Sequence, residues 1–301
     1  MKQKIISLIL IILCSFNLLA CANNAPNASN INTLSPNNTV VAQTEQKTLR
    51  ATRVVALTSL SADLVYNLDK TKLVAVPSRG YTAKEAKFEE FAKIGDRTGV
   101  NLEKIVAQKP DLVVGSDVFQ GNALKKLKEL GVATISHNTS SWNELESLTT
   151  TLATRIGADP QPILNEVQSF LGDVEDHNTT VLVLVSTKPI LSPNRDSWAG
   201  DLLDKFKYKN LTAELQSDAP MRGYINLSAE KILTANPDKI FLIESDNVTT
   251  EEITKQSFWK NLKAVKTNQV YTLPYEGFIS PTSIDSVAEV CKKLRQLVAQ
   301  S

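Results

Sequence analysis

The sequence predicts an α/β fold of two lobes with mainly parallel sheets and flanking helices, joined by one long connecting helix. Three observations support this prediction. From Arg53 onward, short β-rich runs alternate with helical patterns. One helix-into-strand unit occurs twice, about half a molecule apart. A helical region without a β-rich run separates the two sets of predicted strands.

The N-terminus has the pattern of a secretory signal that ends at a lipid-attachment site. A positively charged start precedes the apolar run Ile5–Leu13, which is too short for a membrane-spanning helix of about 20 residues. The sequence Leu-Leu-Ala-Cys follows and resembles a bacterial lipobox. We therefore predict a signal peptide over residues 1–21, acylation of Cys21, and a periplasmic or cell-surface protein anchored to a bacterial membrane. An ordinary cleavage site beside a chance cysteine is the alternative.

Residues 22–50 are rich in Asn, Thr, Ser, Ala and Pro and show no apolar period. Such a segment cannot bury enough apolar surface to offset the entropy lost on ordering, so we predict a flexible tether. The remaining chain is long enough for two lobes. We expect the N-terminal α/β lobe over residues 51–140, a connecting helical region over 141–178 and the C-terminal α/β lobe over 179–301.

Seven β-rich runs are expected to form the two sheets. They are Arg53–Leu57, Leu73–Pro77, Asp111–Gly115 and Val132–Ile135 in the first lobe, and Val181–Val185, Lys239–Ile243 and Val270–Leu273 in the second. Asp63, which follows the first run, is expected to complement a helix dipole or to cap a helix rather than to catalyse a reaction. Trp259 precedes Leu262 in a helical run and is expected to pack in the core.

The connecting region contains two helical patterns. Ser141 and Glu144 have the spacing of a capping box, and the apolar stripe that follows stops at Gly157. A second helix is predicted from Pro160 to Glu175, where it would span about 24 Å and reach from one lobe to the other. An ordinary surface helix within one continuous domain is the alternative.

The repeated unit is the strongest internal evidence for two lobes. Residues 103–111 read EKIVAQKPD and residues 230–238 read EKILTANPD. Each copy predicts a capped helix, with Asn101 or Ser228 as its N-cap, that ends at a proline and leads into a strand.

Composition excludes several classes of protein. The formal net charge is +1, so no broad basic surface for nucleic acid is expected. After removal of the signal and acylation of Cys21, Cys291 alone remains free, on an apolar helical stripe that predicts a buried thiol. No metal site is predicted, because His137 and His177 are the only histidines and no cluster has ligand spacing. Known catalytic motifs are absent, so no enzyme is predicted.

Two stretches resemble the paired signatures of the periplasmic-binding-protein family for siderophores, cobalamin and haem. They are GVNLEKIVAQKPDLVVGSD (99–117) and GYINLSAEKILTANPDKIFLIE (223–244), and FWKNLKAVKTNQVYTLP (258–274) is similar to the family's C-terminal segment. The resemblance implies two α/β lobes around a shallow cleft, and a monomer that serves an ABC permease dimer with its ATPase. It also implies that Glu103 and Glu230 dock on the permease. The alternative is that each of these carboxylates only complements the dipole of its own helix.

Ligands of open α/β sheets bind beyond the carboxyl ends of the strands. The loops expected there are rich in arginine and aromatic residues, which suit a bulky, partly aromatic, anionic ligand. The candidate ligand-binding residues are Arg79, Tyr81, Trp198, Arg222, Tyr224, Arg195 and Tyr275.

The preferred ligand is a ferric siderophore, with the iron arriving already chelated and no cofactor required. Cobalamin and haem remain open as alternatives. So does a ferric site held by Tyr81, Tyr224 and Tyr275. A bare metal-ion binder, an enzyme and a ligand-free adhesion lipoprotein are the less favoured classes.

Overall fold

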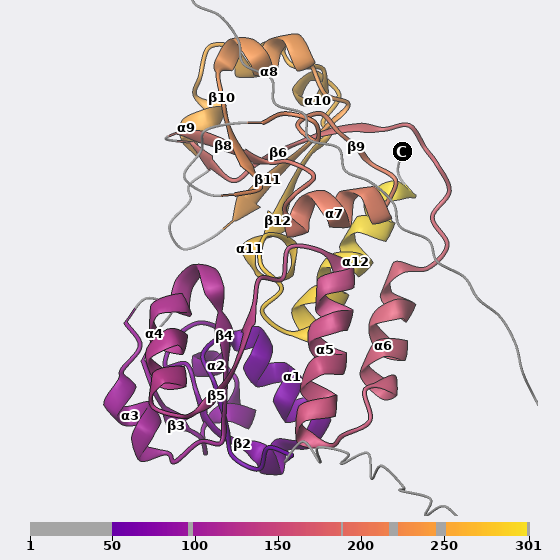
Figure 1. Cartoon of the computed structure of the whole chain (residues 1–301). Helices are drawn as coiled ribbons and strands as arrows, with labels where there is room; N and C mark the ends of the chain where they lie inside the picture. Colours follow the sequence, from indigo (N-terminus) through magenta and orange to yellow (C-terminus); the bar gives the residue numbers. More distant parts are fainter. Residues whose placement is uncertain (1–49, 96–98, 188, 217–221, 245–250, 300–301) are drawn as a thin grey trace, which may run out of the picture. The chain divides into compact units, whose positions relative to one another are not determined.

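The computed structural model describes residues 50–95, 99–187, 189–216, 222–244 and 251–299, and Figure 1 shows their arrangement. The predicted signal peptide, with its lipidation site Cys21, and the predicted tether up to residue 49 lie outside the described residues. Within the described part of the chain, no helix combines the length and the apolar composition needed to cross a bilayer.

Five parallel strands form the N-terminal sheet, in the order β3-β2-β1-β4-β5. Their bounds are β1 Val54–Ala56, β2 Leu73–Val76, β3 Ala92–Lys93, β4 Leu112–Ser116 and β5 Ala133–His137. Four of these strands are predicted by the sequence to within two residues. The two-residue strand β3 is not predicted, because so short a segment carries no detectable period.

Helices cover both faces of this sheet. Their bounds are α1 Ser59–Asp69, η1 Lys70–Lys72, α2 Tyr81–Lys84, η2 Ala86–Phe88, α3 Leu102–Ala107 and α4 Asp117–Glu129. Successive residues of a strand point to opposite faces. Val55 belongs to the buried cluster that contains Ile105 of α3 and Leu127 of α4. Its neighbour Val54 belongs to the cluster that contains Leu64 of α1.

The C-terminal part holds a second parallel sheet, of four strands in the order β12-β11-β6-β9. Their bounds are β6 Thr180–Leu184, β9 Lys209–Asn210, β11 Lys239–Glu244 and β12 Val270–Pro274. The three longer strands are those that the sequence predicts. The sheets therefore fall on either side of residues 141–178, and the lobe boundaries proposed at 140 and 179 are compatible with this division.

A small antiparallel sheet, in the order β10-β8-β7, is also not predicted by the sequence. Its strands are β7 Ser186–Thr187, β8 Ile190–Pro193 and β10 Tyr224–Leu227. The pairing of β8 with β10 joins segments about thirty residues apart, and no local pattern reveals it. Tyr224, expected in a loop, lies instead at the start of β10.

The helices of the C-terminal part are α7 Trp198–Lys205, α8 Ala229–Ala235, α9 Glu251–Thr254, η3 Trp259–Asn261, α10 Lys263–Lys266, α11 Tyr275–Phe278 and α12 Ile284–Val298. Trp259 is 7% exposed and lies in the cluster on one face of the parallel sheet, as predicted. Cys291 lies buried in α12, which confirms the prediction of a core thiol.

Two helices, α5 Trp142–Ile156 and α6 Gln161–Leu171, connect the sheets and lie side by side (Figure 1). Ser141 caps α5, and Gly157 at φ 80° ends it, as expected. The second helix is shorter than predicted: it has 11 residues and ends at Leu171 instead of Glu175. Gly172, at φ 61° and ψ −171°, is not helical, so the chain reaches β6 through a segment that is neither helix nor strand.

One hydrophobic core runs through both parts of the chain. It contains Val54 and Val114 of the N-terminal sheet and Val183 and Phe241 of the C-terminal sheet, together with residues of α5, α6, α7 and α12. The C-terminal helix α12 contacts both α1 and α6. Since a large apolar interface opposes relative movement, this core favours a fixed arrangement of the two sheets.

Candidate ligand-binding site

A cavity of about 490 Å³ lies where the carboxyl ends of four N-terminal strands face the segment 275–282. Its N-terminal wall contains Leu57, Thr58, Ser59, Leu60, Pro77, Arg79, Gly80, Tyr81, Ser116, Phe119, Gln120, His137, Asn138 and Thr139. Its C-terminal wall contains Tyr275, Glu276, Ser280, Pro281 and Thr282. The position follows the rule for open α/β sheets, and the volume is typical of a small-molecule site, about 300–1,000 Å³.

The N-terminal wall is held by hydrogen bonds at the strand ends. Thr58 is the N-cap of α1, and its hydroxyl accepts from the Ser61 amide at 3.1 Å. The side-chain oxygen of Gln120 accepts from the Ser116 amide at 2.9 Å. Gly80 has φ 73°, a conformation that glycine adopts without strain, and it lets the chain turn directly into α2. These contacts give the wall a fixed shape without a bound ligand.

His137 ends β5 and contributes an uncharged imidazole to this wall. Its Nε2 lies 3.3 Å from Thr58 Oγ1, and its Nδ1 lies 3.1 Å from Thr139 Oγ1. Burial lowers the pKa of His137 to about 4, although the negative charges of Asp117 and Glu144 oppose the shift. The ring is therefore neutral at physiological pH, so that one nitrogen donates a hydrogen bond and the other accepts one.

The C-terminal wall bends sharply at Gly277, where φ is 84°. A Cβ there would lie 2.1 Å from the carbonyl oxygen of Ser286, so only glycine lets this wall approach α12 so closely. The indole N–H of Trp198 donates to the Gly277 carbonyl at 2.8 Å and supports the wall from behind. Glu276 lies 4.0 Å from Lys84 of α2, which adds an exposed ion pair between the walls.

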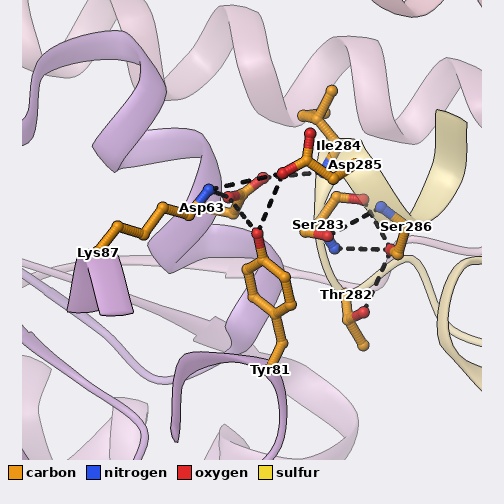
Figure 2. Close-up of polar contacts among 8 residues, drawn as sticks. All are labelled: Asp63, Tyr81, Lys87, Thr282, Ser283, Ile284, Asp285 and Ser286. Carbon is orange, nitrogen blue, oxygen red and sulfur yellow. Dashed lines mark hydrogen bonds and ion pairs between the residues drawn. The ribbon is translucent and has the colours of Figure 1, made fainter. Parts of the chain in front are cut away.

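Three of the seven predicted ligand-binding residues line the cavity: Arg79, Tyr81 and Tyr275. Arg79 is exposed and Tyr275 is half-buried. Tyr81 lines the cavity, and its hydroxyl points toward Asp63, 3.4 Å away (Figure 2). The Tyr81 phenol is therefore already hydrogen-bonded within the protein.

The other four predicted residues do not line the cavity. Trp198 is 3% exposed and stacks on Trp142 with 5.9 Å between ring centroids, so packing decided its position. Tyr224 is buried at the start of β10. Arg195 is exposed and pairs with Glu214, and Arg222 is exposed in the turn before β10.

This placement weakens the sequence-based expectation of an anionic ligand. Among the described residues that line the cavity, Arg79 carries a positive charge and Glu276 a negative one. The remaining polar lining consists of neutral hydroxyl, amide and imidazole groups. Phe119, 41% exposed in the first turn of α4, supplies an aromatic surface and is not among the predicted ligand-binding residues.

The two repeated acidic residues occupy equivalent positions. Glu103 lies in the first turn of α3, where Asn101 accepts from the Lys104 amide at 2.9 Å. Glu230 lies in the first turn of α8, where Ser228 accepts from the Lys231 amide at 3.2 Å. Both carboxylates are exposed. Within the described residues, no group of three or more His, Cys, Asp or Glu side chains is arranged to hold a metal ion.

Parallel sheets in two halves of the chain, with a preformed cavity beside the strand ends, define a two-lobed ligand-binding protein. The chain belongs to the periplasmic binding protein family, which matches residues 54–276. It is an extracytoplasmic substrate-binding protein of the kind that serves ABC transporters, not an enzyme.

Curated relatives agree with this assignment. The chain is 26% identical over 260 residues to YvrC of Bacillus subtilis, an uncharacterised ABC transporter substrate-binding lipoprotein, covering 80% of this chain and 79% of the relative. It is 25% identical to the Fe(3+)-citrate-binding protein YfmC of B. subtilis, over 90% and 89% of the two chains. It is 26% identical to a vitamin B12-binding protein of Vibrio parahaemolyticus, over 80% and 88%.

A solved structure supports the fold. The petrobactin-binding protein YclQ of B. subtilis superposes with a TM-score of 0.71 at 20% identity, covering 83% of this chain and 92% of that one. At this level of identity the likeness concerns the architecture alone.

Proposed function

We propose that this substrate-binding protein captures a ferric siderophore and delivers it to the permease of an ABC importer, while a lipid on Cys21 anchors it to a bacterial membrane. The observation that carries the proposal is the cavity between the strand ends and the segment 275–282. A relative that binds Fe(3+)-citrate supports an iron chelate as the cargo.

The lining of the cavity suits a chelate that already encloses its iron. Arg79 offers a planar fork of donors to carboxylate or hydroxamate oxygens. The rings of Phe119 and Tyr275 offer apolar surface to the ligand skeleton. Since one positive and one negative side chain are present among the described lining residues, a complex of low net charge fits best. The protein itself needs no resident cofactor.

Delivery requires a docking surface, and we assign it to Glu103 and Glu230. Both are exposed, and each begins the same kind of capped helix in its own half of the chain. Two equivalent acidic side chains suit a permease made of two similar subunits that present arginines. Exposed charges of this kind steer and orient a partner more than they tighten binding.

Cobalamin is the second candidate, because a relative of comparable identity is a vitamin B12-binding protein. Cobalamin is held mainly by aromatic and apolar surface, which Phe119 and Tyr275 also offer. Haem remains a further alternative; His137 is neutral and half-buried in the cavity wall.

Calorimetric titration of the full mature chain tests the proposal. The titrants are a ferric hydroxamate, a ferric catecholate, ferric citrate, haem and cobalamin. We expect submicromolar binding of a ferric chelate, with the hydroxamate preferred over the highly charged catecholate. Binding of cobalamin or haem alone would replace the proposed ligand, and the absence of binding by the whole panel would contradict the function.

A further inference from the structure

A polar cluster beside Tyr81, buried at Asp63 and exposed at Asp285, joins α1 to the start of α12 (Figure 2). At its centre is Asp63 of α1, whose side chain is fully buried. One carboxylate oxygen accepts from the backbone amide of Ile284 at 2.8 Å, and the other accepts from Lys87 Nζ at 2.8 Å. The Tyr81 hydroxyl lies 3.4 Å from this second oxygen. Asp63 does not cap its own helix, whose N-cap is Thr58; it accepts from the first amide of a helix more than 200 positions later.

The partner of Asp63 is the first turn of α12. Ser283 is the N-cap of this helix and forms a reciprocal capping box with Ser286. The amide of Ile284, the first residue of α12, has no acceptor within its own helix, and Asp63 supplies one across the interface. A carboxylate at this end also complements the helix dipole. Asp285 completes the cluster, 3.8 Å from Lys87 and 3.4 Å from the Tyr81 hydroxyl.

Lys87 is held in one place by several contacts at once. Its ammonium lies 5.4 Å from the ring centroids of Tyr66, Tyr81 and Phe88, in addition to its ion pair with Asp63. Burial alone would lower the pKa of Lys87, but the hydrogen bonds to Asp63 and Tyr81 and the attraction to Asp63 outweigh it and raise the pKa. Lys87 is therefore charged in the folded protein, and its ammonium lies 2.8 Å from the Asp63 carboxylate.

We propose that Asp63 and Lys87 are positioning residues that fix the spacing between the two walls of the ligand cavity. Tyr81 belongs to the N-terminal wall, and Ser280–Thr282 of the other wall leads directly into the capped turn that Asp63 binds. The cluster therefore acts as a latch between the walls. This inference rests on the proposed function for the meaning of the cavity, whereas the latch itself can be tested without a ligand.

Fluorine NMR of the full mature chain, labelled with 5-fluorotryptophan, provides that test. Trp198 donates to Gly277 in the C-terminal wall and stacks on Trp142, whereas Trp259 lies in a separate cluster and serves as an internal reference. In Asp63→Asn and Lys87→Met we expect the Trp198 resonance to shift or split while that of Trp259 stays in place. Lys87→Arg, which keeps the charge, should restore the native resonance.

Lys263→Met is the matched control, because it removes a lysine–aspartate pair with Asp238 that lies within the C-terminal half. It should lower the melting temperature without moving the Trp198 resonance. If Asp63→Asn does not fold, Tyr81→Phe removes one contact of the cluster and should give a smaller shift of the same signal. A native Trp198 resonance in Lys87→Met and Tyr81→Phe would overturn the proposal.

The effect of the latch on ligand binding is measured in a second experiment, separate from the fluorine NMR. For whichever chelate of the panel binds, its dissociation rate should rise at least tenfold in Lys87→Met and remain native in Lys263→Met. Equal dissociation rates in the two variants would contradict the positioning role. If no chelate binds, the proposed function fails, and the fluorine signals of the unliganded protein still decide whether the latch exists.

Discussion

His137 shows how the environment of one residue sets the chemistry of the cavity. Its ring lies between two threonine hydroxyls, and burial keeps its pKa near 4. A ligand therefore meets a neutral imidazole whose orientation is fixed by Thr58 and Thr139. A protonated histidine would add a second positive charge beside Arg79 and favour a more anionic ligand.

The same shift predicts a pH dependence of stability. The unfolded chain binds a proton at His137 near pH 6.5, whereas the folded protein resists protonation until about pH 4. The unfolded state thus binds more protons in this window, and the free energy of unfolding falls as the pH drops from 6.5 to 4. Between pH 6.5 and 4, the free energy of unfolding measured with urea should fall less in His137→Gln than in the wild type, by up to about 3 kcal/mol. Parallel profiles would show that His137 does not contribute.

At the scale of elements, the repeat encodes a strand clamp in each half of the chain. The carboxylate of Asp111 accepts from the amide and hydroxyl of Thr52, at 2.8 and 2.7 Å. The carboxylate of Asp238 accepts from the amide and hydroxyl of Thr180, at 2.9 and 2.6 Å. Each clamp ties the repeated unit to the start of the first strand of its own parallel sheet, β1 or β6.

Substitution of either aspartate tests the clamps. Asp111→Asn and Asp238→Asn should each lower the free energy of unfolding by about 1–3 kcal/mol, because an amide nitrogen replaces one acceptor beside the threonine. The control is Asp159→Asn, since Asp159 accepts a single hydrogen bond from the Gln161 amide at 2.9 Å and asparagine caps helices equally well. If urea unfolding gives the same loss for all three variants, the clamps are no more important than an ordinary cap.

The sequence predicted the helices and strands whose residue patterns are strong within a short segment. In both parallel sheets, every strand longer than two residues was predicted from a β-rich run. The helix caps Asn101, Ser141 and Ser228 were predicted from the chemistry of their side chains. The antiparallel strand β8 ends in Ser192-Pro193, a composition with weak strand character, and pairs with a distant segment. Its formation depends on tertiary contacts that no local pattern contains.

The difference between local patterns and tertiary contacts also explains which residues of the site could be predicted. Arg79 and Tyr275 follow predicted strands, as the strand-end rule requires, and both line the cavity. Trp198 and Tyr224 have the residue types of a binding site, but the packing of α7 and β10 buries them elsewhere. Asp63 could be predicted to cap a helix, but its partner Ile284 follows from the fold alone.

At the scale of the whole molecule, the shared core and the latch both resist separation of the two halves. Buried residues of both parallel sheets and of α5, α6, α7 and α12 belong to one cluster, and Asp63 adds a polar contact between α1 and α12. We therefore expect capture of the ligand with a small change in structure. In the proposed function, recognition by the permease would then depend on surface features of both halves and not on a large closure.

Charge reversal tests this view of docking. The double variant Glu103→Lys, Glu230→Lys should lose ligand uptake in cells while its purified form binds the ligand as tightly as the wild type, because both side chains are exposed and outside the cavity. Glu129→Lys, at the end of α4, is a control that changes charge outside the repeated turns. Normal uptake by the double variant would show that these residues do not dock.

The most direct test of the binding site compares two arginines that the sequence favours equally. Arg79 lines the cavity and Arg222 does not. Calorimetric titration of Arg79→Ala and Arg222→Ala with the preferred chelate should show affinity reduced about ten- to a hundredfold for the first and unchanged for the second, as expected when one charge-assisted hydrogen bond is lost. A loss of affinity in Arg222→Ala, with native affinity in Arg79→Ala, would place the ligand elsewhere and contradict the account.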